Sequence, residues 1–219
     1  MTEQERLSAA VKEGDLAQVE RMLEADGSLA LARPDGVSIV LLALYHGRRE
    51  LAEFVSARRH DLDVHELAAL GRLAWLRELI ERAPDEARRT SLDGNSPLGL
   101  AALFGHDELA RSLLDAGADP REPSRDARRT TALHLALSRG SLSLSRLLLD
   151  RGADVNAREA TGRTPLHAAA EAGRRELAAL LVERGADPAV RDREGNAPAD
   201  LARANGHFGL ADWLSGVGG

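Results

Sequence analysis

A glycine that recurs at a nearly constant spacing constrains the fold of this chain more than any other sequence feature. It follows an alanine-rich segment seven times, at Gly14, Gly47, Gly71, Gly105, Gly140, Gly173 and Gly206. The successive separations are 33, 24, 34, 35, 33 and 33 residues. A fixed period of this length is the signature of a repeat architecture, in which each unit buries its apolar face by stacking on its neighbours. The sequence therefore predicts one elongated domain over residues 1–219.

Two short motifs recur in phase with these glycines. The first reads TPLH at residues 164–167 and TALH at 131–134, with looser copies at 96–99 and 197–200. The second reads GAD at residues 117–119, 152–154 and 185–187. At a period of 33 residues, these motifs resemble those of the ankyrin-repeat family over about residues 3–215. The resemblance implies an all-α solenoid of about seven helix–turn–helix repeats, with short β-hairpin arms between them.

The repeated residues suit the tasks that such a repeat requires. The hydroxyl of Thr164 is expected to cap the first helix, and Pro165 suits a first helical turn, where its missing N–H costs nothing. The resemblance gives His167 a structural role, in which its ring nitrogens join neighbouring turns. The first helix of each repeat carries small alanines and the second carries bulkier leucines. This difference in thickness predicts a curved stack.

The spacing also predicts where the repeats begin and end. They are assigned to residues 1–33, 34–60, 61–91, 92–126, 127–159, 160–192 and 193–216, with the first and the last as degenerate caps. The short step from Gly47 to Gly71 leaves no room for an arm, so the third repeat is predicted to keep its helices at 64–70 and 73–82 and to lose its hairpin. This loss would leave a notch. A domain boundary is the alternative, but the continuous helical pattern disfavours it.

Composition and missing motifs narrow the possible functions. The chain has no cysteine and a net charge of −6, which disfavour zinc–thiolate sites and a general attraction to nucleic acid or anionic lipid. It begins without an apolar signal segment, and no run approaches the roughly 20 apolar residues that span a bilayer. Phosphate-binding loops, the GxSxG elbow and HExxH are absent. We therefore expect a cytoplasmic, monomeric, non-enzymatic protein that needs no cofactor and binds neither nucleic acid nor membrane.

A groove for a protein partner is the leading functional hypothesis. In the family that the chain resembles, the two residues before each turn glycine face the concave surface. These positions are apolar or aromatic in the middle of the chain, where two of its six aromatic residues fall. Clustered exposed apolar side chains are typical of a partner anchor, and neighbouring arginines can pair with acidic groups of the partner. The predicted groove residues are Tyr45, His46, Leu70, Leu103, Phe104, Arg128, Arg129 and Arg139.

Three alternatives stay open on the sequence alone. The cluster from Tyr45 to Phe104 can fill the notch as packing instead of binding a partner. A metal or small ligand, or an enzyme site, can use the notch around His46, Asp61, Asp63 and His65, whose side chains include oxygen and imidazole ligands. Nucleic acid can bind the arginines at 88, 89, 125, 128 and 129, although the acidic net charge disfavours it. The remaining aromatic residues are predicted to pack in the core: Phe54, Trp75, Phe208 and Trp213.

Overall fold

Short helical segments separated by tight turns account for nearly all of the regular structure. The computed structural model describes residues 2–218 and contains fourteen α-helices and three 3-10 helices over that range. The α-helices are α1 (Glu3–Glu13), α2 (Leu16–Ala25), α3 (Ile39–Tyr45), α4 (Arg49–Ser56), α5 (Val64–Leu70), α6 (Leu73–Arg82), α7 (Pro97–Phe104), α8 (Asp107–Asp115), α9 (Ala132–Arg139), α10 (Leu142–Asp150), α11 (Pro165–Glu171), α12 (Arg175–Glu183), α13 (Pro198–Ala204) and α14 (Phe208–Val217). The 3-10 helices are η1 (Gly27–Leu31), η2 (Pro34–Gly36) and η3 (Pro84–Arg88).

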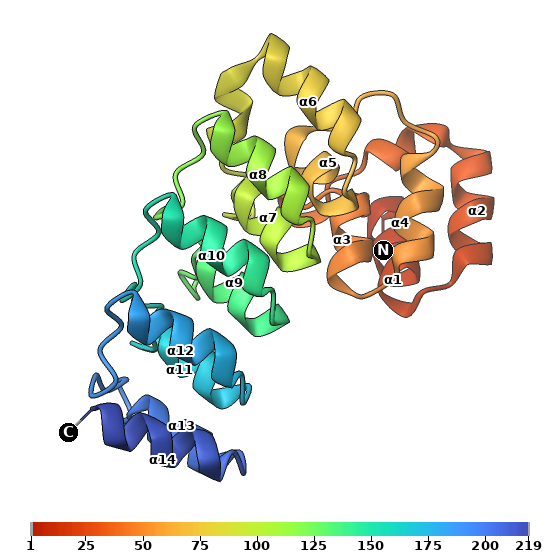
Figure 1. Ribbon diagram of the computed structural model, residues 1–219. Coiled ribbons are helices and arrows are strands. Elements are labelled where there is room, and N and C mark those ends of the chain that lie inside the picture. The colour runs from red at the N-terminus through yellow and green to blue at the C-terminus, as the bar shows by residue number, and fades with distance from the viewer. Residues whose placement is uncertain (1, 219) are drawn as a thin grey trace.

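The α-helices pack in consecutive pairs, and the pairs stack side by side in chain order. Successive odd-numbered helices contact one another along one row, and α6, α8, α10 and α12 do so along a second row. The row of pairs bends as it runs from the red N-terminal end to the blue C-terminal end (Figure 1). The all-α solenoid predicted from the repeat spacing is therefore confirmed, and the helices of the third repeat coincide with the predicted ranges 64–70 and 73–82.

The two rows are lined by side chains of different size. Ala101, Ala136 and Ala169 of the inner row are fully buried, so neighbouring inner helices approach closely. Leu113 and Leu148 are fully buried in the outer row, where they fill a wider space.

The threonine and the histidine of the TPLH motif together cap the start of α11. Nδ1 of His167 accepts from the backbone N–H of Thr164 at 3.1 Å and lies 2.9 Å from its hydroxyl. Nε2 therefore carries the ring proton and donates to the carbonyl of Asn196 at 3.1 Å. The Thr164 side chain faces the backbone of His167 in return, so the two residues form a reciprocal capping box. The imidazole ties the start of α11 to the next arm, as the family resemblance implies.

The arms are turns rather than strands, because no residue from 2 to 218 is assigned to a β-strand. Few backbone hydrogen bonds close an arm: in the fourth arm, Ser91 N–H donates to the Asn95 carbonyl at 2.9 Å and Gly94 N–H donates to the Ser91 carbonyl at 3.0 Å. Another joins each arm to its neighbour, as between Arg125 N–H and the Gly94 carbonyl at 2.8 Å. The row of arms is thus held together by sparse backbone bonds, and side chains supply the remaining contacts.

The connection from α4 to α5, residues 57–63, is built around a buried arginine. Arg59 donates from Nε to Asp61 at 2.9 Å and from Nη1 to the fully buried carboxylate of Glu66. Asp63 accepts from the backbone N–H groups of His65 and Glu66, each at 2.9 Å, and so caps α5. These charged contacts stabilise the short link that the 24-residue step predicts.

Two of the aromatic packing predictions are wrong. Trp75 is 49% exposed, because the buried stripe of α6 runs through Leu76 and Ile80 and leaves Trp75 beside it. Phe208 is 62% exposed, because it is the first residue of α14, whose buried side chains are Leu210, Ala211 and Leu214. Phe54 and Trp213 are partly buried against the core, as predicted.

No single helix in the described part of the chain is long and apolar enough to cross a membrane. One bent pair, Gly27–Gly36 with Ile39–Tyr45, satisfies the same test on length and composition. Five of the seven residues of α3, in the second half of that pair, are buried in the core.

The buried pair of Arg59 and Glu66 predicts a large stability effect for one substitution. Arg59→Leu leaves the carboxylate of Glu66 buried without its cationic partner, so we expect the free energy of unfolding to fall by about 3–5 kcal/mol. The matched control is Arg82→Leu, which breaks the exposed pair with Glu78 and should cost less than about 1 kcal/mol. Urea unfolding followed by circular dichroism measures both, and equal losses would contradict the role assigned to Arg59.

Candidate functional site

A cleft of about 530 Å³ opens where the inner helices α3, α7 and α9 meet the arms that precede α7 and α9. Its apolar surface comes from the helices, and its polar rim comes mainly from the arms. It is lined by Leu44, Tyr45, Asn95, Leu103, Phe104, Asp126, Arg128, Thr130, Leu135 and Arg139. Side chains from three different repeats therefore meet in one concave space.

Tyr45 closes one side of the cleft by reaching across the third repeat. Its ring stacks on that of Phe104, with ring centroids 6.2 Å apart and planes inclined by 20°. Its hydroxyl donates to Oδ2 of Asp93 at 2.7 Å and accepts from the side-chain amide of Asn95 at 3.1 Å. Tyr45 ends α3, whereas the other residues belong to α7 and its arm, so these contacts join elements on either side of α5.

The missing arm of the third repeat allows this approach. Residues 57–63 run directly into α5, whose seven residues are all buried, and no arm separates the second arm from the fourth. The Leu92 side chain lies so close to Gly36 of η2 that a Cβ at Gly36 would be 3.3 Å from Cβ of Leu92. The predicted notch is therefore filled in part by Tyr45 and by the fourth arm, and the cleft is the space that remains.

Burial and hydrogen bonding determine the protonation states of the Tyr45 phenol and the Asp93 carboxylate. Burial, together with the neighbouring carboxylate of Asp93, raises the pKa of Tyr45 well above its ordinary value. Burial alone would raise the pKa of Asp93, but hydrogen bonds from Ser91, Tyr45 and Asn95 lower it overall. The bridge thus pairs a neutral phenol with an ionised carboxylate near neutral pH.

The carboxylate of Asp126 on the rim accepts hydrogen bonds from residues of its own arm. Its Oδ1 accepts from the Ser124 hydroxyl at 2.6 Å and from the backbone N–H groups of Arg128 and Arg129, each at 3.1 Å. These bonds hold Arg129 at a φ of 55°, a left-handed conformation that is uncommon for a residue with a side chain. The arm is therefore shaped by Asp126, which turns the two arginines outward.

The arginines of the rim keep most of their donors unpaired. The side chain of Arg128 is 82% exposed and lies 4.0 Å from Asp126, its one ion-pair contact within residues 2–218. Arg139 donates from Nη1 to the Leu103 carbonyl at 3.1 Å and packs against Gly105. No carboxylate in the described chain pairs with Arg139 or with Arg129. The mouth of the cleft is therefore locally cationic.

Five of the eight predicted groove residues line the cleft: Tyr45, Leu103, Phe104, Arg128 and Arg139. His46 and Arg129 are exposed beside it without lining it. The prediction that Leu70 faces the groove is wrong, because α5 is covered on all sides and Leu70 is 3% exposed.

The sequence reasoning missed the other five lining residues, namely Leu44, Asn95, Asp126, Thr130 and Leu135. Leu135 lies four residues before Arg139, on the same face of α9, so helical periodicity could have found it. Asn95 and Thr130 belong to the arms, whose conformation carries no periodic signal.

The residues proposed for a metal or small ligand do not come together. Asp61 pairs with Arg59, Asp63 pairs with Arg33 at 2.7 Å, and Nε2 of His65 bonds the Arg89 carbonyl at 2.7 Å. No group of three or more histidine, aspartate or glutamate side chains is placed to hold a metal in the described residues. These residues instead stabilise the α4–α5 connection.

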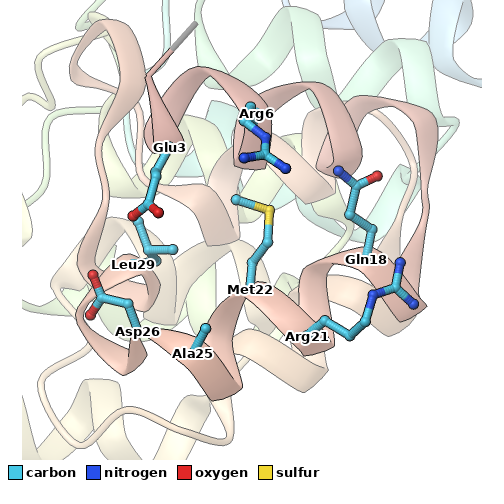
Figure 2. Close-up of a pocket in the computed structure, with 8 residues that line it drawn as sticks. All are labelled: Glu3, Arg6, Gln18, Arg21, Met22, Ala25, Asp26 and Leu29. Carbon is cyan, nitrogen blue, oxygen red and sulfur yellow. The ribbon is translucent and has the colours of Figure 1, made fainter.

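A second hollow, of about 350 Å³, lies on the first repeat between α1, α2 and η1. Figure 2 shows the Met22 side chain near its centre, with Arg6 above it and the acidic side chains of Glu3 and Asp26 to one side. Asp26 accepts from both the backbone N–H and the hydroxyl of Ser28. Mixed charge around a half-covered methionine fits a capping repeat that meets water.

Paired helices, left-handed turn glycines and a concave cleft between inner helices and arms define an ankyrin-type solenoid. A family model for ankyrin repeats, in three copies, matches residues 64–159 and 122–192. The matched segments together span residues 64–192, which is more than half of the chain. The chain therefore belongs to the ankyrin-repeat family, whose repeats generally serve as protein–protein interaction modules.

Three relatives are similar to this chain over part of its length. An ankyrin repeat-containing protein of Treponema pallidum (strain Nichols) is 38% identical over 151 residues, which cover 69% of this chain and 42% of that protein. The yeast protein "Target of rapamycin complex 2 subunit AVO2" is 28% identical over 170 residues, or 70% of this chain and 39% of its own length. Human "DNA-binding protein RFXANK" is 36% identical over 80 residues, or 36% of this chain and 30% of its length. The chain thus spans less than half of each of these relatives.

The hydrogen bonds of Tyr45 with Asp93 and Asn95 across the third repeat lead to a local prediction. Tyr45→Phe keeps the ring on Phe104 but removes the hydroxyl, so Asp93 and Asn95 each lose a hydrogen-bond partner. We expect a loss of about 1 kcal/mol in the free energy of unfolding and faster hydrogen exchange of the Gly94 and Asn95 amides. Exchange in α13, far from the bridge, serves as the internal control. Unchanged exchange at Gly94 and Asn95 would show that Tyr45 does not hold the fourth arm.

Proposed function

We propose that this protein is a non-enzymatic recognition module that binds a partner protein in the cleft formed by α3, α7 and α9. The observation that carries the proposal is the meeting of half-buried apolar side chains with exposed, unpaired arginines in one concave space. The family assignment supports it, because ankyrin repeats generally serve protein–protein interaction.

The apolar lining supplies the binding energy in this proposal. Leu103, Phe104 and Leu135 are each only partly buried, so a partner that covers them removes further apolar surface from water. Their backbones belong to α7 and α9, which pack against each other, and Tyr45 is fixed by two hydrogen bonds. A rigid surface binds with little loss of conformational entropy.

The same proposal describes a monomer that acts in the cytoplasm and recognises protein rather than nucleic acid or membrane. The net charge of −6 supports the choice of a protein partner, because nucleic-acid affinity depends on many phosphate contacts by basic residues.

Substitutions inside the cleft test the proposal. A partner is first captured from the source cells, and its affinity is then measured by isothermal titration calorimetry. Leu103→Asp places a charge on the apolar wall and should weaken binding by about 30-fold or more, as loss of a central contact does. Thr130→Trp is a second variant, which narrows the cleft without adding a charge, and should also weaken binding.

Val217→Asp is the matched control, because it introduces the same charge at an exposed residue of α14, outside the cleft. It should bind as the unaltered protein does. Thermal unfolding of each variant separates lost folding from lost binding. A partner that binds both cleft variants with unaltered affinity would rule out the cleft as its site.

A further inference from the structure

The basic and the acidic side chains around the cleft differ in how many hydrogen-bonding groups they leave for a ligand. Both nearby carboxylates, Asp93 and Asp126, already accept several hydrogen bonds within the protein. Arg128 has only a 4.0 Å contact with Asp126, and Arg139 donates to one backbone carbonyl. The donors that remain for a ligand are therefore cationic, and the acceptors are largely used.

The apolar part of the cleft is shaped to take a bulky side chain. The stacked rings of Tyr45 and Phe104 form one wall, and Leu103 and Leu135 complete the apolar lining. The Tyr45 hydroxyl is already both donor and acceptor, so this wall offers few further hydrogen bonds. The cleft thus joins an apolar interior to a cationic mouth.

The cleft continues toward α11 along the row of arms. A neighbouring hollow of about 210 Å³ shares Arg128, Thr130 and Leu135 with it. In that hollow the cation Arg163 is already paired, with Glu171 at 3.1 Å and with Asp192 at 3.4 Å. An extended chain can therefore occupy both spaces, while the unpaired cations lie at the cleft end.

We propose that the occupant is an acidic segment of a partner protein, which inserts a bulky apolar side chain against Tyr45 and Phe104 and places carboxylates beside Arg128 and Arg139. This inference rests on the proposed function and specifies the chemistry of the partner. Charge complementarity favours the acidic segment, because a basic segment would meet two arginines that have no close ion-pair partner. Guanidinium groups also bind carboxylates through two parallel hydrogen bonds, which adds geometric selectivity.

Selection from a random peptide library displayed on phage tests the inference without knowledge of the natural partner. The unaltered protein should enrich peptides that carry a bulky apolar residue flanked by aspartate or glutamate. A synthetic copy of the enriched peptide should bind at least about tenfold more tightly than a copy with each acid replaced by its amide, and the difference should shrink as salt concentration rises.

Variants of the rim connect the acidic preference to the named arginines. R128Q/R139Q should weaken binding of the acidic peptide about tenfold and should no longer distinguish it from its amide copy. The single variant R128Q tests the same point without disturbing the Arg139 contact to Leu103. The matched control is R111Q/R146Q, which makes the same charge change at exposed positions of the outer helices α8 and α10 and should bind as the unaltered protein does.

The possible results separate this inference from the proposed function. Enriched peptides that lack an acidic preference, or that bind R128Q and R128Q/R139Q as tightly as the unaltered protein, overturn the acidic segment while binding in the cleft stands. Enriched peptides that bind Leu103→Asp and Thr130→Trp without loss show that the cleft is not the binding site, and both proposals then fail. Acidic enrichment that depends on Arg128 supports both.

Discussion

The contact of Tyr45 with Asp93, Asn95 and Phe104 is the interaction on which the concave surface depends. It joins residues 48 and 50 positions apart in the chain, through two hydrogen bonds and one stacked pair of rings. Without it, the end of α3 and the fourth arm would lose their direct contact, and the cleft would lose one wall. A single aromatic side chain thus turns an irregularity of the repeat into a defined concave space.

The irregular third repeat is stabilised by charged contacts in addition to the apolar packing of Leu62 and Val64. Where other repeats use an arm to cover the start of the inner helix, the third repeat uses Arg59, which pairs with Asp61 and with the buried carboxylate of Glu66. Asp63 caps α5 and also pairs with Arg33. Burial would raise the pKa of Asp63, but hydrogen bonds from His65, Glu66 and Arg33 lower it below its ordinary value. The acidic and histidine-rich stretch therefore has a structural explanation in this chain.

Most of the fold could be predicted from the sequence, because a repeat displays the same local rules several times. The glycine spacing and the TPLH motif predicted the helices, including both helices of the irregular third repeat. The candidate site was harder to predict, since it depends on contacts between repeats. Leu70 satisfied the groove rule but lies under its neighbours, whereas Leu135 violated the rule and lines the cleft. Trp75 was misplaced because α6 buries a narrower stripe than the pattern of large residues indicates. Only the packing of neighbouring repeats decides such positions.

The family relation and the cleft support the same account: a rigid stack presents an apolar space with a cationic mouth to a partner protein. The most direct test of this account is the nuclear magnetic resonance spectrum of the leucine methyl groups, recorded with and without a bound ligand selected by the protein. The account predicts that shifts concentrate on Leu44, Leu103 and Leu135, while the methyl groups of Leu144 and Leu177 in the outer row stay unchanged. Shifts centred on the outer row, with Leu103 and Leu135 unaffected, would contradict it.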